Sequence, residues 1–236
     1  MGLRLNQIVP WGRSLQEYIQ MFALSGDDLQ RKILDCAGGP ASFNAEMKQL
    51  GHHIISCDPI YQFSASEIER RVEETYPVIL KGVEANQQKF IWTMMRSPEH
   101  LCQVRMAAMR QFSTDFTQGL QEGRYFVEVL PNLSFDTQQF DLALCSHLLF
   151  TYSDQLSMEF HLAAIKEMCR VASEVRIFPL LVNMTAEISP FLQPVMRELE
   201  AQGYSLEIRQ VPYEFQQGGN QLLQVFGEDR GSFGRK

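Results

Sequence analysis

Residues 33–43, ILDCAGGPASF, contain an apolar run, a turn with Gly38 and Gly39, and the start of a segment with helical spacing. Short apolar runs bounded by turn residues are typical of buried strands. A second such run, HHIISCDP at 52–59, follows the helical segment, and the strand that it predicts ends at Asp58. A strand, a turn, a short helix and another strand make a βαβ unit, so we expect two parallel neighbouring strands.

The rest of the chain repeats this alternation. Further strand-like runs are RYFVEVL at 124–130, FDLALCS at 140–146 and EVRIFPLL at 174–181, with helical patterns between them. The last two runs, SLEIRQV and QLLQVFG, are joined by a loop that suits an antiparallel hairpin. We predict one α/β domain over 1–236: a three-layer sandwich around a seven-strand, mostly parallel sheet with an antiparallel C-terminal hairpin, and ligands at the carboxyl ends of the strands.

The segment 62–122 interrupts the alternation. It has helical patterns, with a capping box at Ser64 and Glu67 and a second helix start at Ser97-Pro98. A simple βαβ crossover needs far less chain. We therefore interpret 62–122 as a helical insertion between the second and third strands.

The composition narrows the function classes. The 236 residues are 45% hydrophobic and carry a formal net charge of -7, with no block of lysine or arginine. Nucleic-acid binders usually show a basic stripe, so we expect no DNA or RNA partner. The five cysteines form no C-x-x-C pair, which disfavours a metal site and predicts reduced core residues in a reducing, cytoplasmic compartment. No apolar run reaches membrane-spanning length, so no membrane partner is expected.

The glycine turn and Asp58 together predict a nucleotide-type ligand. Gly38 and Gly39 let the backbone approach a ligand closely, and an acid at the end of the second strand accepts hydrogen bonds from ribose hydroxyls. The alternative is a plain tight turn and a solvated acid. The pattern G-x-G-x-x-G is absent, and Pro40 lacks the N–H that a pyrophosphate needs, so NAD and FAD are disfavoured. The absence of a Walker A sequence argues against ATP bound in that way.

In these segments the sequence resembles the class I S-adenosylmethionine (SAM)-dependent methyltransferases. Their first motif, D/E-x-G-x-G-x-G, stands as DCAGGPA at 35–41, with Ala37 and Ala41 at the outer glycine positions. Asp58 matches the ribose-binding acid, and LSFDTQQFDLALCSHLLF at 133–150 is similar to the family's stretch around the fourth strand. The segments near the two ends suggest an uncharacterised bacterial subgroup. The resemblance implies a Rossmann-like fold with SAM as the cofactor.

The resemblance also implies roles for residues at the carboxyl edge of the sheet. Asp35 and the turn would hold the methionine part of SAM, Asp58 its ribose, and the segment after the third strand its adenine. His147, just past the fourth strand, would be a general base for a hydroxyl or ammonium acceptor, or would only pack locally. The residues placed around the cofactor are Asp35, Cys36, Ala37, Gly38, Gly39, Asp58, Pro59, Tyr61, Val129, Leu130, Cys145 and Ser146.

Some side chains keep more than one interpretation. Tyr61 would stack on adenine or cover the sheet edge. Arg13, with Trp11, would close over the cofactor carboxylate or lie at the surface. His161 is expected to be a solvated helix residue.

Motifs that are absent from the sequence narrow the class of methyl acceptor. The fourth strand is followed by SHLL at 146–149 and not by N/D-P-P-Y/F, which argues against planar base or glutamine nitrogens. There is also no Pro-Cys nucleophile for cytosine C5. The resemblance thus implies methyl transfer to a small-molecule oxygen or nitrogen nucleophile, with 62–122 covering the cleft. The alternatives are a protein acceptor, a non-catalytic methyltransferase-like binding or regulatory protein, or another nucleotide-dependent enzyme such as an oxidoreductase.

Overall fold

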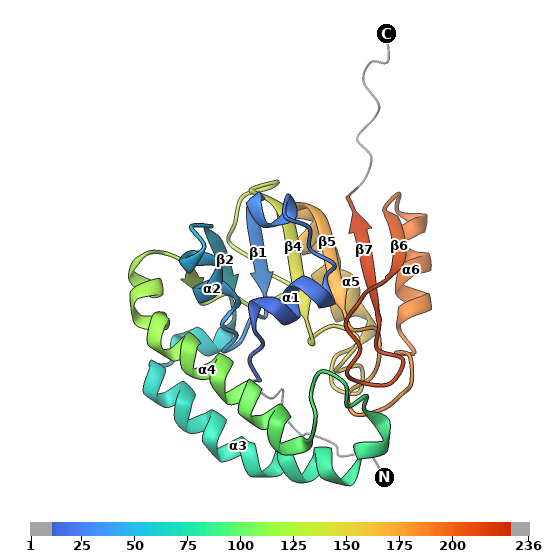
Figure 1. Ribbon diagram of the computed structural model, residues 1–236. Coiled ribbons are helices and arrows are strands. Elements are labelled where there is room, and N and C mark those ends of the chain that lie inside the picture. Colours follow the sequence, from blue (N-terminus) through green and yellow to red (C-terminus); the bar gives the residue numbers. More distant parts are fainter. Residues whose placement is uncertain (1–10, 228–236) are drawn as a thin grey trace.

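A seven-strand sheet lies at the centre of the computed structural model, which describes residues 11–227 (Figure 1). The strand order is β3-β2-β1-β4-β5-β7-β6. Neighbours from β3 to β5 are parallel, and β7 runs antiparallel to both β5 and β6. The strands are β1 (Ile33–Cys36), β2 (Ile54–Cys57), β3 (Tyr125–Phe126), β4 (Phe140–Ser146), β5 (Ala172–Phe178), β6 (Ser205–Gln210) and β7 (Gln221–Phe226). This sheet confirms the predicted Rossmann-like architecture with its antiparallel C-terminal pair.

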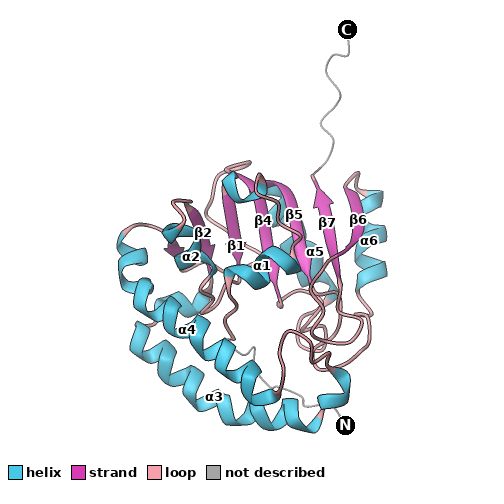
Figure 2. Cartoon of the chain, in the orientation of Figure 1, coloured by secondary structure: helices cyan, strands magenta, loops and turns pink. Residues whose placement is uncertain are grey.

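Helices cover both faces of the sheet and complete the three layers (Figure 2). Helices α1 (Leu15–Met21) and α2 (Phe43–Gln49) pack on one face, and α5 (Met158–Val171) and α6 (Leu192–Ala201) pack on the other. Successive residues of a strand point to opposite faces. In β4, Leu142 and Leu144 pack with residues of α1 and α2, whereas Ala143 and Cys145 pack with residues of α5 and α6. Because both faces are covered, the central strands are apolar almost throughout.

Two long helices stand between β2 and β3. Helix α3 (Ala65–Ala85) begins at the predicted capping box of Ser64 and Glu67, and α4 (Pro98–Gln121) begins at Ser97. Helix α4 packs against α2 and β3, whereas α3 packs on α4 and runs past the carboxyl ends of the strands (Figure 1). The assignment of 1–236 to one domain stays a prediction, since both ends lie outside the described residues.

Two buried arginines tie α4 to the rest of the protein. Arg105 of α4 is paired with Glu17 of α1, and both side chains are almost fully buried. Arg124, just before β3, donates two hydrogen bonds of 2.8 Å to Asp115 of α4. Removing one partner of such a pair leaves a buried charge uncompensated, which is strongly destabilising. The pairs therefore hold α4, and through it α3, in one place relative to the sheet.

The third strand is shorter than predicted. A strand over 124–130 was expected, and β3 contains only two residues. It is an edge strand with a single neighbour, and the side chains of Val127 and Val129 are each 52% exposed instead of facing the core. The chain leaves the sheet and closes a bridge between Val129 and Asn132. Val129 and Leu130 thus follow the carboxyl end of β3 without being part of the sheet.

Candidate functional site

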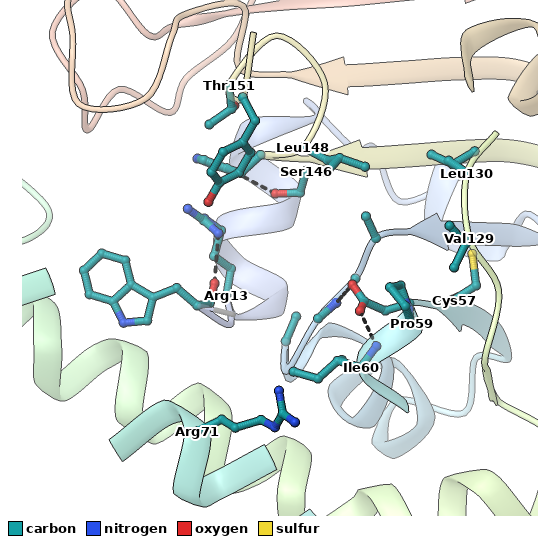
Figure 3. A pocket seen from close by; sticks show the side chains of 18 of the residues that line it. Arg13, Cys57, Pro59, Ile60, Arg71, Val129, Leu130, Ser146, Leu148 and Thr151 are labelled. Atoms are coloured by element: carbon teal, nitrogen blue, oxygen red, sulfur yellow. Dashed lines mark hydrogen bonds between the residues drawn. The ribbon is translucent and has the colours of Figure 1, made fainter. Parts of the chain in front are cut away.

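A cavity of about 810 Å³ lies at the carboxyl ends of β1, β2 and β4, with α3 forming its outer wall. Parallel α/β sheets bind ligands at this edge, where the loops after neighbouring strands converge. Figure 3 shows Pro59, Val129 and Leu130 on one side of the cavity and Arg13 and Thr151 on another. Of the residues predicted from the sequence, nine line it: Ala37, Gly38, Gly39, Asp58, Pro59, Val129, Leu130, Ser146 and His147.

The turn after β1 is shaped by contacts that only glycine permits. A Cβ on Gly38 would lie 2.3 Å from Oδ2 of Asp35, far inside normal contact distance. Gly39 has a φ of +55°, in the left-handed region that favours glycine. The backbone of the turn thus lies directly on the cavity wall with no side chain in front of it.

Asp58 joins the end of β2 to this turn. Its Oδ1 accepts a 2.8 Å hydrogen bond from the Ile60 N–H, and its Oδ2 accepts a 3.1 Å bond from the Gly39 N–H (Figure 3). Burial raises the pKa of this carboxyl to about 6, although the two backbone hydrogen bonds favour its charged form. A carboxylate can accept about four hydrogen bonds, so Asp58 keeps free acceptor capacity on the cavity side.

Asp35 lies beneath the turn and does not line the cavity. It is 1% exposed and accepts 3.0 Å hydrogen bonds from the Tyr18 hydroxyl and the Ser56 hydroxyl. Burial raises its pKa to about 7, and the nearby charge of Asp58 acts in the same direction. In this geometry Asp35 supports the turn from behind.

Three further predicted residues also lie behind the cavity wall. The Tyr61 hydroxyl donates to the Gly39 carbonyl over 2.8 Å, and its buried ring packs in an aromatic cluster with Phe112, Phe116 and Tyr125. Cys36 and Cys145 are completely buried. All five cysteines are free and buried, as the composition predicted.

His147 follows β4 in a conformation that is uncommon for a residue with a side chain. Its φ is +54°, its N–H donates to the Phe178 carbonyl over 2.7 Å, and its Nδ1 lies 2.8 Å from the Ser146 hydroxyl. Such backbone strain is concentrated at functional sites. Burial holds its pKa well below the usual value, and the positive charges of Arg13 and Arg105 lower it further. The imidazole is therefore neutral at neutral pH.

A small second cavity of about 70 Å³ adjoins the first next to His147. The two cavities share five lining residues: Trp11, Arg13, His147, Asn183 and Met184. Arg105 and Tyr213 lie in the wall of the second cavity, and sequence reasoning missed both. One signal was available, because Arg105 stands on the apolar face of its helix, four residues after the fully buried Leu101.

His161 corrects the expectation of a solvated helix residue. The side chain is fully buried, and its Nε2 accepts a 2.9 Å hydrogen bond from the Phe150 N–H. Its Nδ1 therefore carries the proton and donates to the Ser157 carbonyl over 2.7 Å. The residue faces inward because it satisfies the backbone of the β4–α5 loop, which carries Thr151 to the cavity wall.

The described residues show neither a metal-binding cluster nor a membrane-spanning helix. Residues 11–227 contain no group of three or more His, Cys, Asp or Glu side chains placed to hold a metal ion. Within the same range, no helix is both long enough and apolar enough to cross a membrane.

Comparisons with known proteins place the chain beside one curated relative. No protein-family model matches it. The uncharacterised protein MJ0045 of the archaeon Methanocaldococcus jannaschii is 34% identical over 224 residues, which cover 94% of this chain and 97% of the relative. A bacterial subgroup stays a prediction, since this relative is archaeal.

Solved structures with a similar fold include two whose sequences have little identity with this chain. Magnesium protoporphyrin IX methyltransferase from Synechocystis PCC 6803, with bound SAM, is 10% identical, with 91% of this chain and 78% of that chain covered and a TM-score of 0.47. The PH0226 protein of Pyrococcus horikoshii is 12% identical, with 91% of each chain covered and a TM-score of 0.48.

Proposed function

This chain belongs to the same family as the archaeal protein MJ0045, and we propose that it is a SAM-dependent methyltransferase for a small-molecule oxygen or nitrogen nucleophile. The observation that carries the proposal is the hydrogen bond between the Gly39 N–H and Oδ2 of Asp58. It joins the glycine turn after β1 to the acid after β2 in the wall of one cavity. A nucleoside ligand at this edge meets a bare backbone and a carboxylate side by side.

The cavity fits the two ends of the cofactor differently. Its volume of about 810 Å³ lies within the range of roughly 300–1,000 Å³ that small-molecule sites occupy. Pro59, Val129 and Leu130 form an apolar wall for adenine, next to the half-buried Glu128. The remaining acceptor capacity of Asp58 suits the ribose hydroxyls. The open backbone of Ala37 to Gly39 suits the methionine part.

His147 and Ser146 lie where the acceptor would meet the methyl group. When bound, SAM supplies a sulfonium methyl: the acceptor's lone pair forms the new bond to carbon, the C–S bond pair goes to sulfur, and the acceptor loses a proton. A neutral His147 can take that proton. Its low pKa makes it a weak base, so positioning of the acceptor is expected to supply most of the rate.

Calorimetric titration with SAM and S-adenosylhomocysteine tests the cofactor. We expect saturable binding of both, and a loss of at least tenfold in affinity in Asp58→Ala, which removes the ribose acceptor. Asp27→Asn is the matched control, because this exposed acid precedes the short helix Asp28–Gln30 and makes no capping hydrogen bond. Its affinity should equal that of the unaltered protein.

The same titration separates the competing functions. Binding of NADH, with no binding of either SAM or S-adenosylhomocysteine, would overturn the proposal in favour of another nucleotide-dependent enzyme. Binding of SAM without turnover of any acceptor in a small-molecule panel would favour a binding or regulatory protein. Equal affinity in Asp58→Ala would refute the ribose assignment.

A further inference from the structure

The second cavity differs in character from the first. It does not include the glycine turn or Asp58, and it reaches between β5 and the loop before β7. Apolar rings form much of its wall, with Phe90 and Phe215 stacked at 4.8 Å. Two guanidinium groups, those of Arg13 and Arg105, lie in the same wall. A small pocket with apolar walls and two cations is suited to a small molecule that carries an anionic group.

The positive charge around this cavity is not balanced. Glu17 is paired with Arg105, and no ion pair within residues 11–227 involves Arg13. Arg13 donates from one terminal nitrogen to the Trp11 carbonyl over 2.9 Å. One carboxylate thus faces two guanidinium groups, and burial together with the charge of Arg105 lowers the pKa of Arg13 to about 10. Arg13 is half-buried, with its Nε shielded from solvent. A shielded cation without a counter-ion is unfavourable, and an anionic ligand would offset that cost.

Unpartnered polar atoms give a second, independent indication. Within the described residues, the buried Nε atoms of both Arg13 and Arg105 have no hydrogen-bond partner. The hydroxyl of Thr151, which is 4% exposed and lines the main cavity, also has none. A fourth such atom, Oε1 of Gln20, lies at neither cavity. Buried polar groups in native proteins are almost always satisfied, so the two Nε atoms, which belong to arginines of the same cavity wall, point to a missing ligand there.

We infer that the methyl acceptor is a small organic acid whose carboxylate is bound in the second cavity by Arg13 and Arg105. The inference rests on the proposed methyltransferase function. The acceptor's nucleophilic atom would then lie at the junction of the two cavities, beside His147 and Asn183, which line both. Guanidinium groups are well matched to carboxylates, because their parallel N–H donors bind both oxygens.

This arrangement also couples acceptor binding to the state of His147. The charges of Arg13 and Arg105 are two of the causes that hold the pKa of His147 low. A bound carboxylate neutralises that field, so the imidazole becomes a stronger base when the acceptor is present. The direction of this change can be measured by NMR.

SAM carries a carboxylate too, so binding of an acceptor carboxylate has to be measured with the cofactor site already filled. The protein is first saturated with S-adenosylhomocysteine and is then titrated with benzoate, benzamide and benzylamine, which share a ring and differ in charge. Benzoate should bind, and the neutral and cationic probes should bind at least tenfold more weakly. Benzoate should also raise the pKa of His147, followed through its imidazole resonances.

Arg13→Gln should reduce benzoate affinity at least tenfold while leaving S-adenosylhomocysteine affinity within about twofold. Arg13→Lys should recover part of the benzoate affinity, since it keeps the charge. Arg110→Gln is the matched control, because Arg110 is exposed on the same helix as Arg105 and should change nothing. The thermal midpoint of the unliganded Arg13→Gln protein should stay the same or rise, because a half-buried cation without a counter-ion is removed.

Four results would overturn the inference. The first is equal binding of the three probes, and the second is no binding of benzoate to a protein that does bind S-adenosylhomocysteine. The third is an Arg13→Gln protein that loses S-adenosylhomocysteine and keeps benzoate, which would assign Arg13 to the cofactor carboxylate. The fourth is an Arg13→Gln protein that unfolds at lower temperature, which would make Arg13 a structural residue. Failure of S-adenosylhomocysteine itself to bind would instead remove the proposed function.

Discussion

A Cβ added to Gly38 would lie 2.3 Å from Oδ2 of Asp35. That oxygen cannot easily move aside, because the Ser56 hydroxyl holds it at 3.0 Å and the Tyr18 hydroxyl holds the other oxygen of the same carboxyl. The glycine turn and the buried acid therefore act as one unit. Asp58 joins this unit through its bond to Gly39.

Gly38→Ala should distort this unit. We expect the free energy of unfolding to fall by roughly 1–3 kcal/mol, because an added methyl must displace a held carboxylate. S-adenosylhomocysteine affinity should fall as well, because the turn lies in the cavity wall. Urea unfolding and calorimetry measure the two effects. Gly26→Ala is the control, since a Cβ there meets nothing within 4 Å; similar losses in both variants would contradict the steric argument.

Asp35 should give the protein a pH-dependent stability. Its pKa is about 7 in the folded protein and 3.8 ordinarily, so the folded state holds this proton more tightly than the unfolded chain. The contribution is present below about pH 4 and is lost as the pH rises to about 7, with a size of about 4 kcal/mol for a shift of about three pKa units. Urea unfolding of the unaltered protein and Asp35→Asn across this range measures it.

The quantity to follow is the difference in the free energy of unfolding between the unaltered protein and Asp35→Asn, because the contributions of the other titrating groups cancel in it. The unaltered protein should lose stability relative to Asp35→Asn between about pH 4 and pH 7. Two parallel profiles would show that Asp35 titrates normally in the folded protein.

Cofactor affinity should follow the ionisation of Asp58. In the proposed function, the carboxylate form of Asp58 would accept hydrogen bonds from the ribose hydroxyls, and its pKa is about 6 in the unliganded protein. S-adenosylhomocysteine should therefore bind more weakly as the pH falls below about 6, by up to about tenfold per pH unit. Calorimetry from about pH 5 to pH 8 checks this. Asp58→Asn should bind weakly at every pH, and a pH dependence retained in that variant would point to Asp35 instead.

Local patterns in the sequence predicted much of this protein. The strand at 33–36, the glycine turn and the strand at 54–57 could be read from short apolar runs, and Ser64 with Glu67 marked the start of α3. The predicted end of the third strand at residue 130 was wrong. Val127 and Val129 have strand-like side chains, but β3 is an edge strand and no second neighbouring strand covers them. Periodicity reports the preference of a segment and not the number of its neighbours.

The candidate site was likewise predicted only in part from the sequence. The turn and Asp58 follow directly from strand ends, so nine of the predicted residues line the cavity. Asp35 and Tyr61 have suitable chemistry, but the structure places them behind the wall, where they hold the turn. Whether a polar side chain supports a site or faces its ligand depends on packing that one strand alone does not specify.

The sequence by itself determined the seven-strand α/β architecture and the edge of the sheet where a ligand would bind, because alternating strands and helices and their caps are local properties of the chain. Only the tertiary structure decided where the charge lies. Glu17 and Arg105 are 88 residues apart, and folding pairs them. Arg105 then lies with Arg13 in the wall of a second cavity. Electrostatic balance depends on distances and burial across the whole fold, so that site became visible only in three dimensions.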